Sequence, residues 1–159
     1  MSILKSLTLT VALALPLSGV ARTALACSMP AGVAQMMADA GAAMNAQRKA
    51  NGRKALGRDA KLDQAAQKHA CWMGETGTFS HKGAGGSLPK RRIKATGYRT
   101  RLTAENIAFG QSSGQTVIAD WMTSQGHRKN ILLRGVKEYG IGVANMNGRP
   151  VWVMVYAAN

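Results

Sequence analysis

Acidic residues are scarce in this chain: 7 Asp and Glu stand against 21 Lys and Arg in 159 residues, a formal charge of +14. A surplus of this kind favours partners that carry negative charge. Aromatic residues make up only 5% of the chain. That is too few for the stacking surface on which single-stranded nucleic acids bind, so nucleic acid is a poor candidate. The apolar fraction of 46% excludes a disordered chain, and the length fits one domain.

Long apolar runs are also missing. A membrane-spanning helix needs about 20 apolar residues, and the apolar stretch from Leu7 to Leu17 is shorter. With Lys5 before it and the small-residue motif Ala24-Leu25-Ala26 after it, this stretch indicates an export signal over residues 1–26. Its removal leaves residues 27–159 as one domain with a charge of +12 and no transmembrane segment. We expect a secreted protein, periplasmic or extracellular.

Cysteine occurs only twice, at Cys27 and Cys71. Because an exported protein enters an oxidising compartment, we predict a disulfide between the two, worth about 3–4 kcal/mol in the loop-entropy model. Two free, buried thiols are one alternative. Lipidation of Cys27, the first residue after cleavage, is another, although Ala24 stands where lipoprotein signals generally have leucine.

The periodicity of the apolar residues changes along the chain. Alternating apolar residues flank Asn147-Gly148, a strong hairpin signal. Helices therefore come first and strands last, which predicts an α+β fold with helices packed on an antiparallel sheet. The expected helices are Val33–Asn51, a second from Asp59 or Ala60 to Gly74–Gly77, a short basic one from Ser87-Leu88-Pro89 to Gly97, Gly114–Ser124 and Gly126–Leu133, with an extended or irregular segment over Thr103–Phe109.

Histidine, too, is rare, with three in the chain. His69 lies on the apolar stripe of the second helix and is interpreted as a core residue. His81 lies in a glycine-flanked loop, where functional groups are common, and His127 lies at a break between two helices. Glu105 has apolar neighbours, so its carboxylate must be paired, hydrogen-bonded or in a cavity. Two imidazoles and a carboxylate are the ligands of His₂Glu zinc sites. His81, Glu105 and His127 lie far apart in the sequence, however, so a structural role for these residues remains the leading interpretation.

Ser124 is a candidate nucleophile of a hydrolase. Together with His127 and Glu105 it has the residue types of a Ser-His-acid hydrolase, and His81 with His127 has those of a site that activates a metal-bound water. Nothing resembles a nucleophile elbow. A cap on the helix that starts near Gly126 is the favoured interpretation of Ser124.

Several segments, in order, resemble the CAP superfamily of cysteine-rich secretory proteins, antigen 5 and pathogenesis-related 1 proteins, over about residues 41–157. They are Asn45-Ala-Gln-Arg48, Leu62-x-x-Ala65-x-x-x-His69, Phe79-Ser-His81, Ala104-Glu105-Asn106-Ile107-Ala108, Trp121-x-x-Ser124-x-Gly126-His127-x-x-Asn130-Ile131-Leu132 and the Tyr139-Gly-Ile-Gly142-Val strand. The Trp121–Leu132 form is similar to that of the bacterial, SCP-like branch.

The resemblance implies an α-β-α sandwich whose cavity is lined by two His and two Glu. His81, Glu105 and His127 match three of these positions, and Ser124 stands at the fourth. The resemblance implies that His81 and His127 hold a divalent metal such as zinc, with weaker affinity than a full tetrad, and that Glu105 orients an imidazole or a water.

For function, the resemblance implies a secreted binding module for a lipid, another small ligand or a cell-envelope component, with a secreted protease-like hydrolase as the alternative. Six cations in twelve residues lie near the His81 loop and fit an anionic envelope surface. A solvated helix face that keeps the protein soluble is the other interpretation. The six are Lys90, Arg91, Arg92, Lys94, Arg99 and Arg101.

Overall fold

The computed structural model describes residues 27–159, and the predicted export signal over residues 1–26 lies outside the described residues. The helices begin and end within a few residues of the predicted limits. In chain order the elements are α1 (Val33–Ala50), β1 (Gly57–Arg58), α2 (Ala60–Thr76), the 3-10 turn η1 (Ala84–Gly86), α3 (Pro89–Ala95), β2 (Leu102–Phe109), α4 (Gly114–Thr123), α5 (Gln125–Ile131), β3 (Glu138–Met146) and β4 (Arg149–Ala158).

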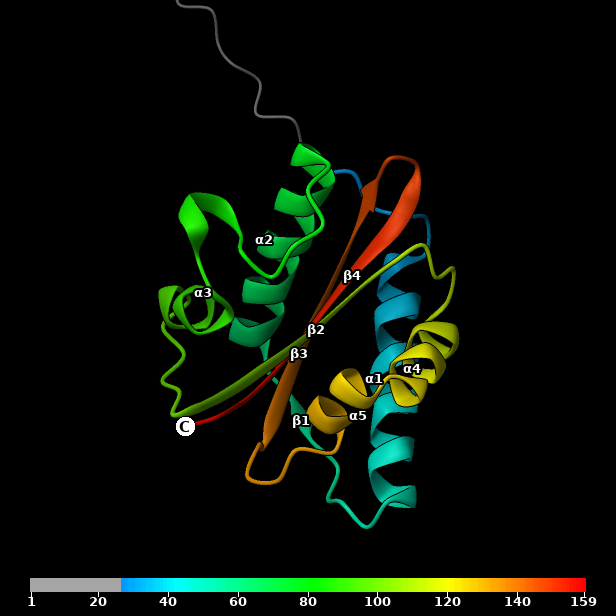
Figure 1. The fold of residues 1–159 in the computed structure, drawn as a ribbon, viewed down its shortest axis with the longest axis vertical. Helices are drawn as coiled ribbons and strands as arrows, with labels where there is room; N and C mark the ends of the chain where they lie inside the picture. Colours follow the sequence, from blue (N-terminus) through cyan, green and yellow to red (C-terminus); the bar gives the residue numbers. More distant parts are fainter. Residues whose placement is uncertain (1–26) are drawn as a thin grey trace, which may run out of the picture.

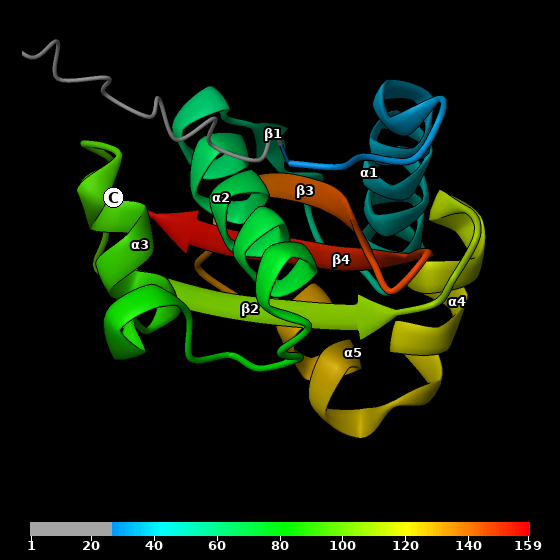
Figure 2. The same cartoon turned by 90° about the horizontal axis from the view of Figure 1, so that it is seen from above.

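The sheet lies between two layers of helices. On one face lie α2 and α3, and on the other lie α1, α4 and α5 (Figure 1). The strand order is β1-β3-β4-β2, and Figure 2 shows β3, β4 and β2 side by side with β2 next to α5. The predicted α+β sandwich is confirmed.

The C-terminal hairpin forms where Asn147-Gly148 predicted it. Both residues have positive φ, 49° and 77°, as a two-residue hairpin turn requires, and Met146 pairs with Arg149 across the turn. The extended segment after α3 is a full strand, because β2 pairs antiparallel with β4 along its length. One strand was not indicated by the sequence: β1 pairs parallel with β3, so the sheet is mixed although mostly antiparallel.

Alternate residues of β3 explain how close α2 approaches the sheet. Tyr139, Ile141 and Val143 pack in the core on the side of α1 and α4. Between them, a Cβ at Gly140 would lie 2.1 Å from the backbone of Leu62, and one at Gly142 would lie 2.4 Å from the backbone of Gln67. The two glycines therefore let the helix backbone lie against the strand.

The two cysteines form a disulfide, as predicted, over a sequence separation of 44. It links the segment before α1 to the middle of α2. Asn145 adds a second contact to this segment, since its backbone N–H donates to the carbonyl of Ser28 at 2.7 Å. Among residues 27–159 no helix is both long enough and apolar enough to cross a membrane.

Candidate functional site

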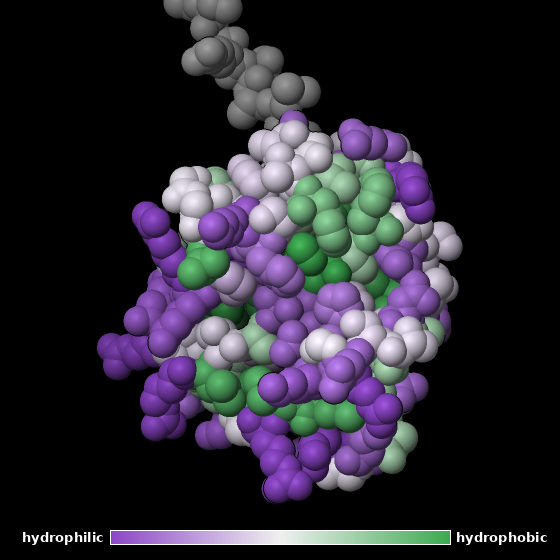
Figure 3. All heavy atoms as spheres, viewed as in Figure 1, coloured by the Kyte–Doolittle hydropathy of each residue, from purple (hydrophilic) through white to green (hydrophobic). Residues whose placement is uncertain are grey.

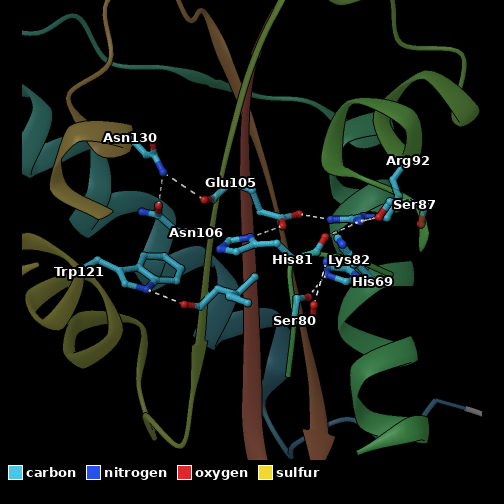
Figure 4. A network of polar contacts seen from close by, with 11 residues as sticks. His69, Ser80, His81, Lys82, Ser87, Arg92, Glu105, Asn106, Trp121 and Asn130 are labelled. Atoms are coloured by element: carbon cyan, nitrogen blue, oxygen red, sulfur yellow. Dashed lines mark hydrogen bonds and ion pairs between the residues drawn. The ribbon is translucent and has the colours of Figure 1, made fainter. Parts of the chain in front are cut away.

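The candidate residues gather at the free edge of the sheet. Within residues 27–159, β2 pairs only with β4, and successive residues of a strand point to opposite faces. Glu105 and Asn106 therefore face different helical layers, toward the His81 loop and toward α5 respectively. Figure 4 shows side chains from both layers meeting around these two residues.

Glu105 is buried and bonded on both oxygens. Its side chain is 2% exposed; the ring Nδ1–H of His81 donates to Oε1 at 2.8 Å, and Arg92 donates to Oε2 at 2.5 Å. Because Nδ1 of His81 faces the carboxylate, its Nε2 is directed away from Glu105. Glu105 was expected to be paired because its sequence neighbours are apolar, and its partners are His81 and Arg92. Through its bond to Nδ1, Glu105 orients the His81 ring.

Arg92 also fixes the loop that carries His81. Its Nη1 donates to the main-chain carbonyls of His81, at 3.0 Å, and Ser87, at 2.5 Å. Its side chain is only 11% exposed, so Arg92 belongs to the candidate site and not to the basic surface predicted from the charge run. The other five cations of that run are exposed, and this group is called the basic surface below: Lys90, Arg91, Lys94, Arg99 and Arg101.

Two asparagines tie α5 to the free edge of β2. Asn130 donates to the main-chain carbonyl of Glu105 at 3.1 Å and to Oδ1 of Asn106 at 2.9 Å. Asn106 in turn donates to the main-chain carbonyl of His127 at 3.1 Å, and Trp121 donates to the carbonyl of Ile107 at 3.3 Å. The outward carbonyls of an edge strand are thus satisfied by side chains. Neither asparagine was assigned a role from the sequence, although both stand in the segments that resemble the CAP superfamily.

His127 is half-buried beside Trp121, with ring centroids 6.1 Å apart. Burial, followed by the charge of His81, lowers the pKa of His127 below its usual value. His127 is therefore neutral at neutral pH, with an unprotonated ring nitrogen. The dependence of this pKa on His81 also links the two imidazoles electrostatically.

Ser124 occupies the junction of α4 and α5. It stands at the N-cap position of α5, as predicted, but its side chain makes no capping hydrogen bond. Among residues 27–159 no hydrogen bond joins Ser124 to His127, and Glu105 bonds to His81. The hydrolase triad considered from the sequence is therefore not connected.

The residues also fail as a three-ligand metal centre. In the part of the chain that the structure describes, no three His, Cys, Asp or Glu side chains cluster so as to hold a metal ion. Both oxygens of Glu105 are already hydrogen-bonded, one to His81 and the other to Arg92. The predicted binding of a metal by His81 and His127 therefore stays a prediction.

His69 is buried, as predicted. It is 1% exposed, and its ring stacks on Trp72 with centroids 5.7 Å apart. Its Nε2 lies 2.9 Å from the carbonyl of Ser80, the residue before His81. His69 therefore supports the His81 loop from the α2 side.

The family of the protein follows from a comparison of its sequence with family models. Residues 42–156 match the model of the family described as "CAP: Cysteine-rich secretory protein family". The chain belongs to this family.

Among its relatives is YkwD of Bacillus subtilis, 35% identical over 98 residues, which are 62% of this chain and 38% of YkwD. The chain thus spans less than half of that protein. An outer surface protein of Borrelia burgdorferi has the same fold, with a TM-score of 0.71 and 22% identity over 79% of this chain and 93% of the other. An extracellular protein of Bacillus anthracis that contains an SCP domain also has a TM-score of 0.71, with 24% identity over 79% of this chain and 41% of the other.

A more distant structure of the same fold is titled as NaASP2 with Zn2+. Its TM-score is 0.51, with 13% identity over 81% of this chain and 80% of the other. A CAP protein has therefore been crystallised with zinc, but identity at this level shows only the fold.

Proposed function

We propose that this protein is an exported binding module that takes an anionic amphiphile, such as a fatty acid or a phospholipid, beside His81. One observation carries the proposal: the His81 ring is held from behind by Glu105, which Arg92 in turn holds. The ring itself is 51% exposed. A ring fixed in this way meets a ligand at little entropic cost.

Exposed apolar side chains lie close to His81 in the sequence. Phe79, two residues before His81, is 48% exposed and packs against Phe109 with centroids 6.4 Å apart. Leu88, at the start of α3, is 55% exposed. Figure 3 shows hydrophobic atoms in the upper and in the lower half of this view, bordered by hydrophilic ones. An alkyl chain would cover such a surface while its polar head meets His81.

The basic surface favours a negatively charged head group. Its five cations are exposed, and three of them, Lys94, Arg99 and Arg101, line a groove of about 780 Å³ together with Tyr98. Hydrophilic atoms are dense over α3 in the space-filling view (Figure 3). Cations near a phospholipid surface contribute about 1 kcal/mol each, so this surface supports binding to an anionic envelope.

An extracytoplasmic location fits the proposal. The relatives from Borrelia burgdorferi and Bacillus anthracis are titled as outer surface and extracellular proteins, and a disulfide is stable in an oxidising compartment. We infer that this protein acts in the periplasm or outside the cell. Zinc bound through His81 and His127 alone remains a separate hypothesis, and the binding proposed here does not require it.

Calorimetric titration with laurate tests the proposal, with dodecanol as the uncharged control of equal chain length. We expect laurate to bind and dodecanol to bind at least about fivefold more weakly, since one cation near an anionic head group contributes about 1 kcal/mol and dodecanol carries no charge. His81→Ala and Phe79→Ser should each weaken laurate binding. Lys49→Ala, an exposed change on α1, is the matched control and should not. Equal laurate affinity in all four proteins, or no binding, would refute the proposal.

A further inference from the structure

The segment that joins α3 to β2 presents two arginines on one side. It runs past the C-terminal end of β4 (Figure 1), and its residues alternate in exposure. Gly97, Arg99 and Arg101 are exposed, whereas Tyr98 and Thr100 are buried. Alternation of this kind is typical of an extended backbone, in which residues two apart point to the same side. Arg99 and Arg101 therefore project to the same side of the segment.

The two buried residues hold this segment in place. The hydroxyl of Tyr98 donates to the carboxylate of Glu138. The hydroxyl of Thr100 lies 3.2 Å from the main-chain carbonyl of Ala158, and the backbone N–H of Arg101 donates to the same carbonyl at 2.9 Å. The backbone that carries the arginines is therefore fixed before a ligand arrives, which lowers the entropic cost of binding.

Lys94 joins the two arginines in lining the groove of about 780 Å³. Among residues 27–159 no carboxylate side chain lines this groove, and no ion pair joins any of its three cations to an acid. Arg101 uses one N–H, which donates to the main-chain oxygen of Asn159 at 3.0 Å. Unpaired like charges repel one another, and an anion between them removes this repulsion.

Acidic residues limit where an anion can lie. A second groove, of about 330 Å³, shares part of its lining with the first, and its other lining residues are Asp59, Glu138 and Lys61. The two carboxylates repel an anion, so the second groove is less favourable for one than the first. An anion is therefore expected in the first groove, against Lys94 and Arg101.

We propose that the first groove binds a ligand that carries two or more adjacent phosphate groups. The guanidinium group of arginine is a planar fork that bonds phosphate through two N–H groups, and lysine adds a point charge. One phosphate group carries at most about two negative charges, so a single phosphate leaves one of the three cations unpaired. The proposal rests on the part of the proposed function that assigns the basic surface to an anionic envelope, and it names the groups recognised there.

Calorimetric titration with tripolyphosphate and with inorganic phosphate tests the match to adjacent groups. Each cation that meets a phosphate contributes about fivefold to affinity, so tripolyphosphate should bind at least about fivefold more tightly than inorganic phosphate. Added sodium chloride should weaken this binding, because salt screens exposed charges. Equal affinities for the two probes, or no binding of tripolyphosphate, overturns the proposal.

Two double variants of equal charge separate the groove from general attraction by the basic surface. Arg99→Ala/Arg101→Ala removes two cations from the groove. Lys90→Ala/Arg91→Ala is the matched control, because it removes two exposed cations of the basic surface that do not line the groove. Tripolyphosphate affinity should fall at least about tenfold in the first variant and less than about twofold in the control. An equal loss in both overturns the proposal. Laurate binding beside His81 is a separate measurement, so either proposal can fail alone.

Vesicles distinguish a lipid head group from a soluble ligand as the source of the phosphates. Cardiolipin holds two phosphate groups close together and phosphatidylglycerol holds one, so vesicles of equal total charge differ in this pairing. Tighter binding to cardiolipin vesicles that is lost in Arg99→Ala/Arg101→Ala assigns the phosphates to a lipid. Equal binding to both vesicles, together with selective binding of tripolyphosphate, assigns them to a soluble ligand.

Discussion

Arg92 bonds the oxygen of Glu105 that the His81 ring leaves free. One buried carboxylate thereby joins three segments, the loop after α2, helix α3 and strand β2. Removing an ion-pair partner leaves an uncompensated buried charge, which costs far more than the pair contributes when intact. The orientation of His81 and the stability of this corner of the fold therefore depend on the same arginine.

Arg92→Ala should lower the free energy of unfolding by about 3 kcal/mol, the cost of breaking a buried pair, as measured by urea denaturation at pH 7. Arg91→Ala removes an exposed cation from the same helix and should change stability by less than about 0.5 kcal/mol. If the free energy of unfolding falls equally in the two variants, the Arg92–Glu105 contact does not stabilise the fold as predicted.

Acid should destabilise the protein before its carboxylates titrate. His69 and His127 have pKa values lowered by burial, whereas an imidazole in the unfolded chain titrates near pH ~6.5. Below that pH the unfolded chain holds more protons than the native protein. The stabilisation is thus complete above pH ~6.5 and is lost as the pH falls through the native pKa values. Urea denaturation at pH 7 and at pH 5 measures the loss.

The effect of His81 on the pKa of His127 can be measured separately. Its charge is the second cause of the lowered pKa of His127, so His81→Gln should raise that pKa while burial keeps it below the usual value. An NMR titration of the His127 ring protons measures the shift. A pKa of His127 that does not change in His81→Gln would show that the two rings do not interact.

The elements of the fold that depend on local pattern were predictable. Apolar periodicity, together with the helix-start signal at Ser87-Leu88-Pro89, predicted the helices. Asn147-Gly148 predicted the hairpin, because positive φ at two successive positions selects these residue types. β1 was missed because two residues carry no periodicity. The close contact of α2 with β3 was missed because Gly140 and Gly142 have meaning only once the backbone of α2 is known to lie against them.

The site was predictable in part. A lone acid among apolar residues must be paired, which marked Glu105, but charge alone does not identify its partner. Arg92 stood in a run of cations and was assigned to the surface, since a sequence does not show which face of a short helix turns inward. Asn106 and Asn130 were missed because their bonds satisfy a strand edge, and the position of β2 at that edge is a property of the topology.

The disulfide should contribute about 4 kcal/mol, as expected for closing a loop of this length in the unfolded chain. The double variant Cys27→Ser/Cys71→Ser should therefore unfold at a lower urea concentration than the oxidised protein. A reducing agent should lower the midpoint of the native protein and leave that of the double variant unchanged. Equal midpoints for native and variant proteins under oxidising conditions would contradict the predicted contribution.

Ser124→Ala should leave laurate binding, and any hydrolysis of an activated ester such as p-nitrophenyl acetate, within about twofold of the unaltered protein. The reason is geometric: a serine nucleophile needs a base within hydrogen-bond reach, and Ser124 has no bond to His127 among the described residues. Steady-state hydrolysis by both proteins measures this. Loss of esterase activity in Ser124→Ala alone would establish the hydrolase alternative.

Zinc should bind weakly, with a dissociation constant above about 1 µM, because two imidazoles fall short of the four ligands with which structural sites gain about 10–16 kcal/mol. Calorimetry should show that this weak binding is lost in His81→Ala/His127→Ala. Arg92→Ala gives the sharper test, since it frees one oxygen of Glu105 and removes a positive charge beside it. We expect that variant to bind zinc about tenfold more tightly, provided it is assayed where it stays folded. Zinc affinity that is already submicromolar, and unchanged in Arg92→Ala, would mean that Glu105 is available to a metal despite its contacts with His81 and Arg92.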